Sequence, residues 1–360
     1  MQRFLPQYAL TVSSWSDKAV ESFADGAAFG IERRYSRGMS LLKLSPSYKD
    51  YIWGGHRLVE EYHKKYDGDI LAESWELSCH PDGPSYLAEG PEKGLTLTEY
   101  IQAHGRDVLG TNCKRFADFP ILIKFIDARG NLSIQVHPDN AYAREHENQF
   151  GKTEMWYIMD AAPGAFLYYG FDHTISREEM EQRIRENTLL EVLHKEPVEK
   201  GDVLFIPSGT IHAICENIVI AEIQQNSNVT YRVYDYGRLG ADGKPRALHV
   251  QKALDVTRRE PAVRDLHCAP HLADCEYFTV DKVTLAEADD TYCGCADEGS
   301  FHSILIMDGE GTITCGAEAY SFRKGDSYFI TAGSGAYTLK GCCEALISHV
   351  SAKNDRRQSD

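Results

Sequence analysis

The sequence predicts a mainly β protein built from two copies of a β-sandwich or β-barrel unit. Its 360 residues are enough for two or three folded units. Most of the chain consists of short apolar segments separated by Gly, Pro and Asp turns, a pattern that is typical of such folds. One sequence pattern also occurs twice, which indicates that the β unit is duplicated.

Six segments in the middle of the chain have the length and the apolar content of strands. They are Phe119–Asp127, Leu132–His137, Glu154–Asp160, Ala165–Tyr169, Val203–Pro207 and Ile218–Gln225. Two helices are also expected. One lies between Leu95 and Gly105 and ends at the glycine. The other begins after Ser176, which is expected to form a capping box with Glu179.

The repeated pattern relates two parts of the chain at an offset of 124 residues. Residues 201–209 (GDVLFIPSG) match residues 325–333 (GDSYFITAG). A shorter Ile-Met-Asp match, at 158–160 and again at 306–308, precedes the two copies. His212 of the first copy falls opposite Ala336 of the second. Chemistry that uses this histidine therefore belongs to the first copy, and we expect the second copy to be structural.

The composition and the net charge disfavour several classes of function. The formal net charge of −16 disfavours binding to nucleic acid or to anionic membranes. No segment approaches the roughly 18 consecutive apolar residues of a membrane span, and no secretory leader is visible at the start. The ten cysteines are scattered without a CxxC pair. We therefore expect free thiols in a reducing cytoplasm.

The strand that begins at Leu132 carries an unusual polar pair. Side chains alternate along a strand, so Leu132, Ile134 and Val136 are expected on one face. Gln135 and His137 then lie on the other face. Burying an imidazole and a carboxamide without partners would cost roughly 1–3 kcal/mol each. A metal ion would satisfy both groups.

Two later residues could complete a metal site. Glu154 begins the next strand and supplies a carboxylate, and His212 follows a Pro-Ser-Gly turn and supplies a second imidazole. Either histidine alone would more often be an ordinary buried or loop residue. Together with Gln135 and His137, however, they form an N/O ligand set that suits zinc, with iron and manganese also possible.

The sequence around these residues resembles the metal site of the type I mannose-6-phosphate isomerases, a cupin family, and most of all its short bacterial members. The matching strings are QVHPD at 135–139, GKTE at 151–154 and PSGTIHA at 207–213. The resemblance runs from about Leu42 to Val350. It includes YIWGG at 51–55 and ESWELSCHP at 73–81.

This resemblance implies two cupin-type β-barrel (jelly-roll) domains with a few short helices. We expect a catalytic domain at 39–258 with a helical insertion, and a metal-free cupin-like domain at 259–350. Residues 1–38 would be an extension or a miscalled start, and 351–360 a polar tail. The family also implies one zinc ion per chain. Its expected ligands are Gln135, His137, Glu154 and His212.

The implied reaction interconverts mannose 6-phosphate and fructose 6-phosphate by moving a proton between C1 and C2 through a cis-enediol. The resemblance implies that Arg232 is catalytic and that Lys152 lines the same pocket. Both are expected to bind the substrate, at either the developing oxyanion or the phosphate. Glu222, a pocket lysine or a water on the zinc could carry the proton. We count Glu222 among the substrate-binding residues.

Two other functions remain open. A non-catalytic, sugar-phosphate-binding regulatory cupin would bind its ligand without turnover, although Arg232 and Lys152 weigh against it. An iron-dependent cupin oxygenase usually has His-x-His, whereas residue 135 is Gln and Glu154 follows His137 by 17 residues. We expect a cytoplasmic monomer or homodimer whose partner is a small sugar phosphate, with no nucleic acid or membrane partner.

Overall fold

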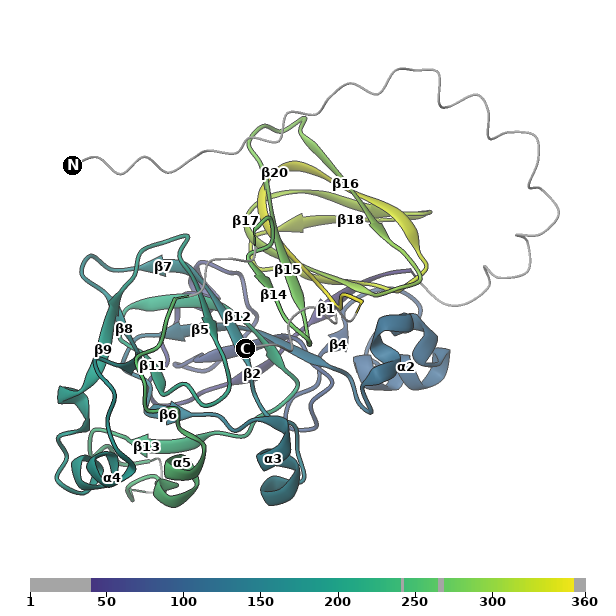
Figure 1. The fold of residues 1–360 in the computed structure, drawn as a ribbon. Helices are drawn as coiled ribbons and strands as arrows, with labels where there is room; N and C mark the ends of the chain where they lie inside the picture. Colours follow the sequence, from purple (N-terminus) through teal and green to yellow (C-terminus); the bar gives the residue numbers. More distant parts are fainter. Residues whose placement is uncertain (1–39, 241–242, 265–268, 353–360) are drawn as a thin grey trace. The chain divides into compact units, whose positions relative to one another are not determined.

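The computed structural model describes residues 40–240, 243–264 and 269–352, which form a mainly β unit (Figure 1). The predicted fold class is confirmed. The expected extension at 1–38 and most of the expected tail at 351–360 lie outside the described residues. None of the helices in the described part is long and apolar enough to cross a bilayer.

Two antiparallel sheets build the first barrel. One has six strands in the order β10-β7-β12-β5-β3-β2, and the other has five in the order β13-β6-β11-β8-β9. The six strands are β2 (Ser47–Lys49), β3 (Glu73–Leu77), β5 (Ile121–Ala128), β7 (Glu154–Ala161), β10 (Val203–Ile206) and β12 (Ile218–Gln225). The five are β6 (Ile134–Val136), β8 (Phe166–Phe171), β9 (Leu193–Pro197), β11 (His212–Ile214) and β13 (Tyr231–Tyr234).

A third, nine-stranded antiparallel sheet builds the second barrel. Its main path is β14-β15-β20-β17-β19-β1-β4, with β16 paired to β20 and β18 paired to β17. The strands are β1 (Leu41–Ser45), β4 (Tyr86–Leu87), β14 (Ala273–Asp274), β15 (Thr279–Leu285), β16 (Thr291–Ala296), β17 (His302–Cys315), β18 (Glu318–Arg323), β19 (Ser327–Ile330) and β20 (Gly335–His349).

Strand β1 joins the second barrel although it comes first in the described chain. Leu41 pairs with Ile330 of β19, and on the other side Leu44 pairs with Leu87 of β4. The next strand, β2, already belongs to the six-stranded sheet. The chain therefore crosses from one barrel to the other within a few residues. Nothing in the sequence pattern indicated this exchange, and the division at 258/259 stays a prediction.

The central strands of the six-stranded sheet are buried on both faces. All eight residues of β5 and all eight of β12 are buried. On one face, Ile123, Tyr157 and Ala221 pack in a core shared with Phe278 and Leu305 of the second barrel. The other face fills the interior of the first barrel together with residues of β8 and β11. This double burial explains the nearly continuous apolar strings of these strands.

Five α-helices and three short 3₁₀ helices connect the described strands. They are α1 (Arg57–Glu60), α2 (Leu97–His104), α3 (Asn140–Glu147), α4 (Arg177–Arg185), α5 (Val250–Val256), η1 (Arg106–Leu109), η2 (Thr111–Arg115) and η3 (Leu189–Glu191). Helices α4 and α5 pack on the outer face of the five-stranded sheet through Met180, Ala253 and Leu254 (Figure 1). The helical insertion therefore covers one wall of the first barrel.

The two expected helices exist, and the glycine end predicted for the first is confirmed, but the capping box predicted for the second is incomplete. Helix α2 ends at Gly105, which has φ 85°, and begins with a full capping box between Thr96 and Glu99. At α4, Ser176 accepts a hydrogen bond from the Glu179 amide (3.1 Å). The Glu179 side chain accepts from Arg183 Nε (2.9 Å) instead of from the Ser176 amide. The predicted capping box is therefore only half formed, because an arginine one turn later competes for the carboxylate.

The duplication is confirmed in the backbone. In the first barrel the Ile158 amide donates to the Asp202 carbonyl (2.9 Å), and the Gly201 amide donates to the Ile158 carbonyl (2.8 Å). In the second barrel Ile306 is bonded in the same way to residues 325 and 326, at 2.9 Å each. The glycines that begin both copies have a positive φ, near 90°. Each copy therefore forms the same turn into a strand.

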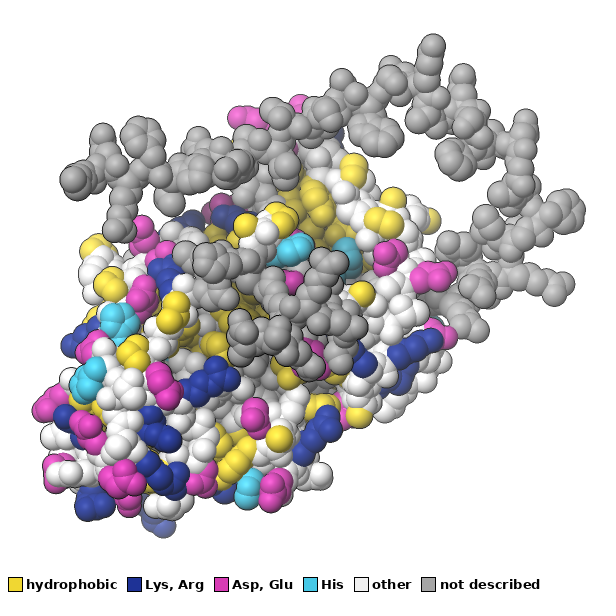
Figure 2. All heavy atoms as spheres, viewed as in Figure 1, with side chains coloured by type: hydrophobic (Ala, Val, Ile, Leu, Met, Phe, Trp, Pro, Cys, Tyr) yellow, Lys and Arg dark blue, Asp and Glu magenta, His cyan; other side chains and the backbone are white. Residues whose placement is uncertain are grey.

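The expected strands are all present, with ends shifted by a few residues. Strand β6 is the shortest of them and begins only at Ile134. Leu132 therefore lies outside the strand and packs inside the first barrel, not with Ile134 and Val136 as predicted. The surface shown in Figure 2 carries basic and acidic side chains interspersed over the described residues, without a large patch of one sign.

Candidate active site

A row of polar side chains crosses the inner face of the five-stranded sheet. Gln135 of β6 lies directly opposite His212 of β11 on one side and Arg232 of β13 on the other. Directly opposed residues of antiparallel strands point to the same side of the sheet. The neighbouring Ile134 and Val136 pack on the outer side with the helices. Gln135, His212 and Arg232 therefore point into the barrel.

A second row faces it from the six-stranded sheet. Trp156 of β7, Glu222 of β12 and Lys124 of β5 lie opposite one another, and none of them is more than 3% exposed. Trp156 Nε1 donates to Glu222 Oε2 (2.9 Å). Lys124 Nζ lies 3.5 Å from Glu222 Oε1. The interior of the barrel is thus apolar at one end and strongly charged at the other.

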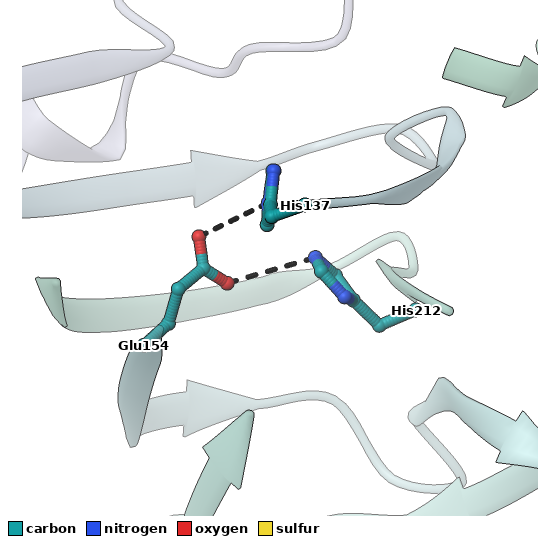
Figure 3. Close-up of side chains that lie close together, drawn as sticks. All are labelled: His137, Glu154 and His212. Carbon is teal, nitrogen blue, oxygen red and sulfur yellow. Dashed lines mark ion pairs between the residues drawn. The ribbon is translucent and has the colours of Figure 1, made fainter. Parts of the chain in front are cut away.

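Three buried side chains meet between the two rows. His137 follows β6, while Glu154 and His212 begin β7 and β11. The Glu154 carboxylate points toward both imidazoles (Figure 3). Its Oε1 lies 3.2 Å from His137 Nε2, and its Oε2 lies 3.6 Å from His212 Nε2. One ligand atom from each residue lies within 4.8 Å of the other two, so the cluster could hold a metal ion.

Both imidazoles present an unprotonated nitrogen to the carboxylate. His137 Nδ1 donates to the Val229 carbonyl (2.8 Å), and His212 Nδ1 donates to the Thr210 carbonyl (2.9 Å). Because a carbonyl only accepts, these bonds fix the proton on Nδ1 and leave a lone pair on Nε2. Burial, followed by the charge on Lys152, lowers the pKa of His137 to about 3. Burial also lowers the pKa of His212.

This arrangement fits a bound cation. The Glu154 side chain is fully buried, its Oε2 has no hydrogen-bond donor, and its Oε1 contacts the ammonium group of Lys152. A cation between the two imidazole lone pairs and the ionised carboxylate would offset their mutual repulsion, in addition to the charge of Lys152 beside Oε1. Burial would raise the pKa of Glu154, but the charge on Lys152 and then the histidines lower it well below the usual value. Two nitrogens and one carboxylate are ligands that zinc accepts.

Gln135 lies beside the cluster rather than within it. Its Nε2 lies 3.4 Å from His212 Nε2, so the amide group is near the imidazole. The oxygen and nitrogen of a carboxamide exchange places by a rotation of half a turn. That rotation would direct Oε1 toward the cluster. Gln135 therefore lies beside one residue of the cluster, and its role as a metal ligand stays a prediction.

Lys152 lies between the His137–Glu154–His212 cluster and the charged row of the six-stranded sheet. Its Nζ contacts Glu154 Oε1, and it lies 3.4 Å from His137 Nε2 and 3.9 Å from Glu222 Oε1. The lysine is only 5% exposed. One cation therefore touches both a candidate metal ligand and a free carboxylate oxygen of the pocket, since Glu222 Oε1 has no hydrogen-bond donor.

The charged row continues through a second buried lysine. Lys124 Nζ lies 3.3 Å from Glu73 Oε2 and also contacts Glu222. Burial disfavours the charge on Lys124, but the two carboxylates outweigh it and raise its pKa. Burial, followed by the charge on Glu154, raises the pKa of Glu222. The pocket wall thus alternates acidic and basic groups in an environment of low polarity.

These residues open into a pocket of about 270 Å³. Arg232 is half-buried at its far side, where its Nη1 donates to the Ala247 carbonyl (3.0 Å). Burial, followed by the charge on Arg246, lowers the pKa of Arg232. The side chains that line the pocket are mostly polar: Tyr51, Trp53, Glu73, Lys124, Ile126, Leu132, Ser133, Gln135, Lys152, Ile214, Glu222, Asn228, Thr230, Arg232 and Arg246.

Four of the seven residues predicted from the sequence line this pocket: Gln135, Lys152, Glu222 and Arg232. The other three, His137, Glu154 and His212, form the buried cluster that Lys152 and Gln135 contact. The individual roles of all seven stay predictions. The sequence reasoning missed Glu73, Lys124 and Arg246. Lys124 left a signal, because it interrupts the apolar string ILIKFID at a position that faces the barrel interior. Glu73 lay within a string that was recognised only for its resemblance. Arg246 follows a Gly-Lys-Pro turn and left no signal of its own.

Two family models match the chain. Residues 41–163 match the type I phosphomannose isomerase catalytic domain, and residues 270–350 match the cupin domain of mannose-6-phosphate isomerase. Among curated proteins, the mannose-6-phosphate isomerase ManA of Bacillus subtilis is 36% identical over 320 residues, covering 86% of this chain and 98% of that protein. The mannose-6-phosphate isomerase of Streptococcus mutans is 38% identical over 307 residues, covering 83% and 94%.

A solved structure agrees with these matches. The crystal structure of the mannose 6-phosphate isomerase from Bacillus subtilis superposes with a TM-score of 0.79 at 34% identity, covering 87% of this chain and all of that chain. A structure from Archaeoglobus fulgidus, described as a putative mannosephosphate isomerase, has the same fold, with a TM-score of 0.71 at 21% identity. The chain therefore belongs to the type I phosphomannose isomerases, a family of isomerases with cupin barrels.

Proposed function

We propose that this protein is a zinc-dependent aldose–ketose isomerase that interconverts mannose 6-phosphate and fructose 6-phosphate through a cis-enediol. The observation that carries the proposal is the buried His137–Glu154–His212 cluster, which leaves Glu154 Oε2 without a donor and contacts Lys152 of a charged pocket. Membership of the family supports the substrate, because its curated members are named for mannose 6-phosphate.

His137, Glu154 and His212 would hold the zinc ion, with Gln135 as a fourth ligand. The donor set of two imidazoles and a carboxylate, with a neutral amide in reach, supports zinc over ions that prefer oxygen ligands alone. When bound, zinc would act as a Lewis acid that stabilises negative charge developing on the substrate oxygens. One ion per chain is expected.

The chain's own charged residues position the sugar and move the proton. Lys152 is placed beside the cluster, where its cation would stabilise the enediolate oxygens. Glu222 lines the pocket with an oxygen that has no donor, so it is the carboxylate best placed to take the proton from C2 and return it to C1. Arg232 would bind the substrate at the far side as a cation. These three roles need no redox cofactor.

The remaining expectations concern the whole chain. We assign 39–258 as the catalytic domain and 259–350 as a second domain without a catalytic metal. In support, the described residues contain a cluster of three potential metal ligands in the first barrel alone. The exposed thiols of Cys293, Cys295 and Cys342 support a reducing cytoplasm. Each described site residue comes from one chain, which allows a monomer or a homodimer.

A coupled assay of the purified full chain tests the proposal. Conversion of mannose 6-phosphate to fructose 6-phosphate is measured before chelation, after chelation and after zinc is restored. We expect turnover that disappears with the chelator and returns with zinc. Binding of sugar phosphate without turnover, in protein that carries zinc, would contradict the proposal and favour a regulatory cupin. Oxygen consumption by the iron-loaded protein would favour an oxygenase.

A further inference from the structure

Three arginines surround one buried carboxylate at the side of the pocket opposite the metal cluster. Asp235 accepts from Arg246 through Nε (2.7 Å) and Nη2 (2.6 Å), which is a bidentate pair. It also accepts from Arg238 Nη2 (2.6 Å). The Asp235 side chain is only 6% exposed. Arg232 belongs to the same group, because the charges of Arg246 and Arg238 both act on it.

This arginine cluster has unpaired positive charge. Arg232 forms no ion pair with any carboxylate among the described residues, and its buried Nε has no hydrogen-bond acceptor. Asp235 is the sole ion-pair partner of Arg246 in the same part of the chain. A guanidinium group has five N–H donors, and Asp235 takes two of those on Arg246. Three donors of Arg246 are therefore available to a ligand.

At the other end of the pocket, negative charges outnumber positive charges. There the ammonium groups of Lys124 and Lys152 face three carboxylates, Glu73, Glu154 and Glu222. That end is already compensated and is the place for a cation at Glu154. An anion entering the pocket is therefore drawn to the arginines, where positive charge exceeds negative charge.

The spacing fits a phosphorylated sugar. Arg232, Gln135 and His212 occupy one register row on three adjacent strands. Adjacent strands lie about 4.8 Å apart, so the arginine backbone is roughly 10 Å from that of His212. This separation is comparable to the span of an open six-carbon chain with a terminal phosphate. The carbonyl end and the phosphate end can therefore reach the two poles of the pocket at once.

We propose that Arg246 binds the phosphate group of the substrate together with Arg232, and that Asp235 is the positioning residue that holds Arg246 in place. Both arginines line the pocket. In this assignment, Lys152 acts at the reacting carbons of the sugar, and the two arginines bind its phosphate. It rests on the proposed function for the identity of the sugar. The binding of a phosphate anion does not depend on turnover.

The first test measures inorganic phosphate binding by calorimetry, using the full chain loaded with zinc. Arg246→Met is compared with Arg264→Met as a matched control. Arg264 has similar exposure, 26% against 21%, and also pairs with carboxylates, Glu196 and Asp202, but it does not line the pocket. We expect Arg246→Met to weaken phosphate binding about 10- to 100-fold. Arg264→Met should bind phosphate like the unaltered chain.

Kinetics provide the second readout. Arg246→Met should raise the KM for mannose 6-phosphate by a similar factor with kcat changed less than about threefold, because the phosphate does not react. Arg246→Lys should have a KM between those of the unaltered chain and Arg246→Met, since it keeps the charge and loses the bidentate pair with Asp235. A KM and a phosphate affinity that are unchanged in Arg246→Met would overturn the proposal.

Asp235→Asn separates positioning from simple charge. Removing a negative charge near the arginines would by itself tighten phosphate binding. If Asp235 positions Arg246, the variant must instead weaken phosphate binding and raise KM. Tighter binding in Asp235→Asn would therefore contradict the positioning role. If the protein binds phosphate through Arg246 but has no isomerase activity, the proposed function alone is refuted. If the protein is an isomerase and its KM does not change in Arg246→Met, this inference alone is refuted.

Discussion

Both barrels contain an equivalent pair of antiparallel strands, but different side chains stand at the equivalent positions. In the first, Glu154 of β7 lies opposite Ile206 of β10, and in the second His302 of β17 lies opposite Ile330 of β19. Ile206 and Ile330 are related by the 124-residue offset, so His302 occupies the place of Glu154. By the same offset the place of His212 is taken by an alanine.

The difference lies in how each barrel satisfies its interior polar group. In the first barrel Glu154 Oε2 has no hydrogen-bond donor, and Oε1 contacts the ammonium group of Lys152. In the second barrel His302 Nδ1 is hydrogen-bonded to the Tyr337 hydroxyl (2.9 Å), and its ring lies beside that of His349, with ring centres 5.2 Å apart. The first copy thus leaves a buried carboxylate oxygen that a bound cation could satisfy, whereas His302 of the second copy is hydrogen-bonded to a side chain of its own barrel. A shared backbone does not preserve a shared chemistry.

The sharpest test of this contrast is a pair of equivalent substitutions. Glu154→Gln should reduce the zinc content from about one per chain to near zero and lower turnover on the order of 1,000-fold or more. His302→Gln, at the corresponding place in the second barrel, should leave both within about twofold. Metal analysis and the coupled assay measure the two effects. Equal loss of zinc in both variants would show that the second barrel shares in metal binding.

The joint between the barrels should account for the largest effect on stability. Lys64 Nζ pairs with Glu76 Oε1 at 2.6 Å and also donates to the Gly325 carbonyl of the second barrel, at 2.5 Å. Both side chains of the ion pair are at least nine-tenths buried. Lys64→Met leaves Glu76 buried without its partner, so we expect a loss of about 3–5 kcal/mol in the free energy of unfolding. Urea denaturation measures it.

A surface pair provides the control for that measurement. Lys114 lies 3.9 Å from Asp107, and both side chains are largely exposed to water. Lys114→Met should therefore change stability by less than about 0.5 kcal/mol. A Lys64→Met chain as stable as the control would mean that the barrels are held together by their apolar contact alone.

Acid should affect the second barrel through His302. Burial, followed by the charge on His349, lowers the pKa of His302 to about 4. The unfolded chain binds this proton near pH 6.5 and the folded chain only near pH 4. Stability should therefore fall as the pH drops through this window, on the order of 2 kcal/mol from this residue. Asp281 and Asp297 oppose the shift and limit its size.

Unfolding midpoints at a series of pH values measure this contribution. In His302→Asn the part of the acid sensitivity between pH 6.5 and 4 that comes from this residue should disappear, while stability at neutral pH changes through the lost Tyr337 contact. An unchanged slope in the variant would assign the acid sensitivity to other groups, beginning with His349, whose pKa is also lowered by burial.

The smallest expected effect concerns a hydrogen bond between the barrels. Lys282 Nζ of β15 donates to the Tyr157 hydroxyl of β7 at 2.8 Å, and it also pairs with Glu344. Lys282→Met and Tyr157→Phe should each cost about 1 kcal/mol. Because both remove the same bond, the double variant should cost less than the sum of the two. Fully additive losses would show that the bond contributes nothing to stability.

The sequence allowed much of the site to be predicted because the relevant signal is local. Alternation along one short strand was enough to place Gln135 and His137 on the inner face, and this is confirmed. Glu154 and His212 stand at strand beginnings, where turn residues mark the position. The duplicated Gly-Asp pattern likewise depends on a local turn. Such features survive in a single sequence because neighbours along the chain define them.

The remainder depended on pairing between distant strands. Lys124 becomes part of the pocket only because β5 lies next to β12, which brings it opposite Glu222. Arg246 reaches the pocket through a buried Asp235 eleven residues earlier, and an Arg-Asp pair at that separation has no recognisable pattern. The half-formed capping box at Ser176 has a local cause instead, since Arg183 lies one helical turn after Glu179 and competes for its carboxylate. Contacts between residues far apart in the sequence cannot be predicted from the periodicity of a short segment.

The exchange of β1 into the second barrel has a consequence for how the chain folds as it is made. Leu41 cannot pair with Ile330 until β19 has left the ribosome, so β1 stays without this partner while the residues between them are synthesised. The pocket residues Tyr51 and Trp53 follow that waiting strand closely. The active-site wall is therefore expected to close only after β19 has been synthesised, and the nascent chain carries an apolar strand without this partner until then.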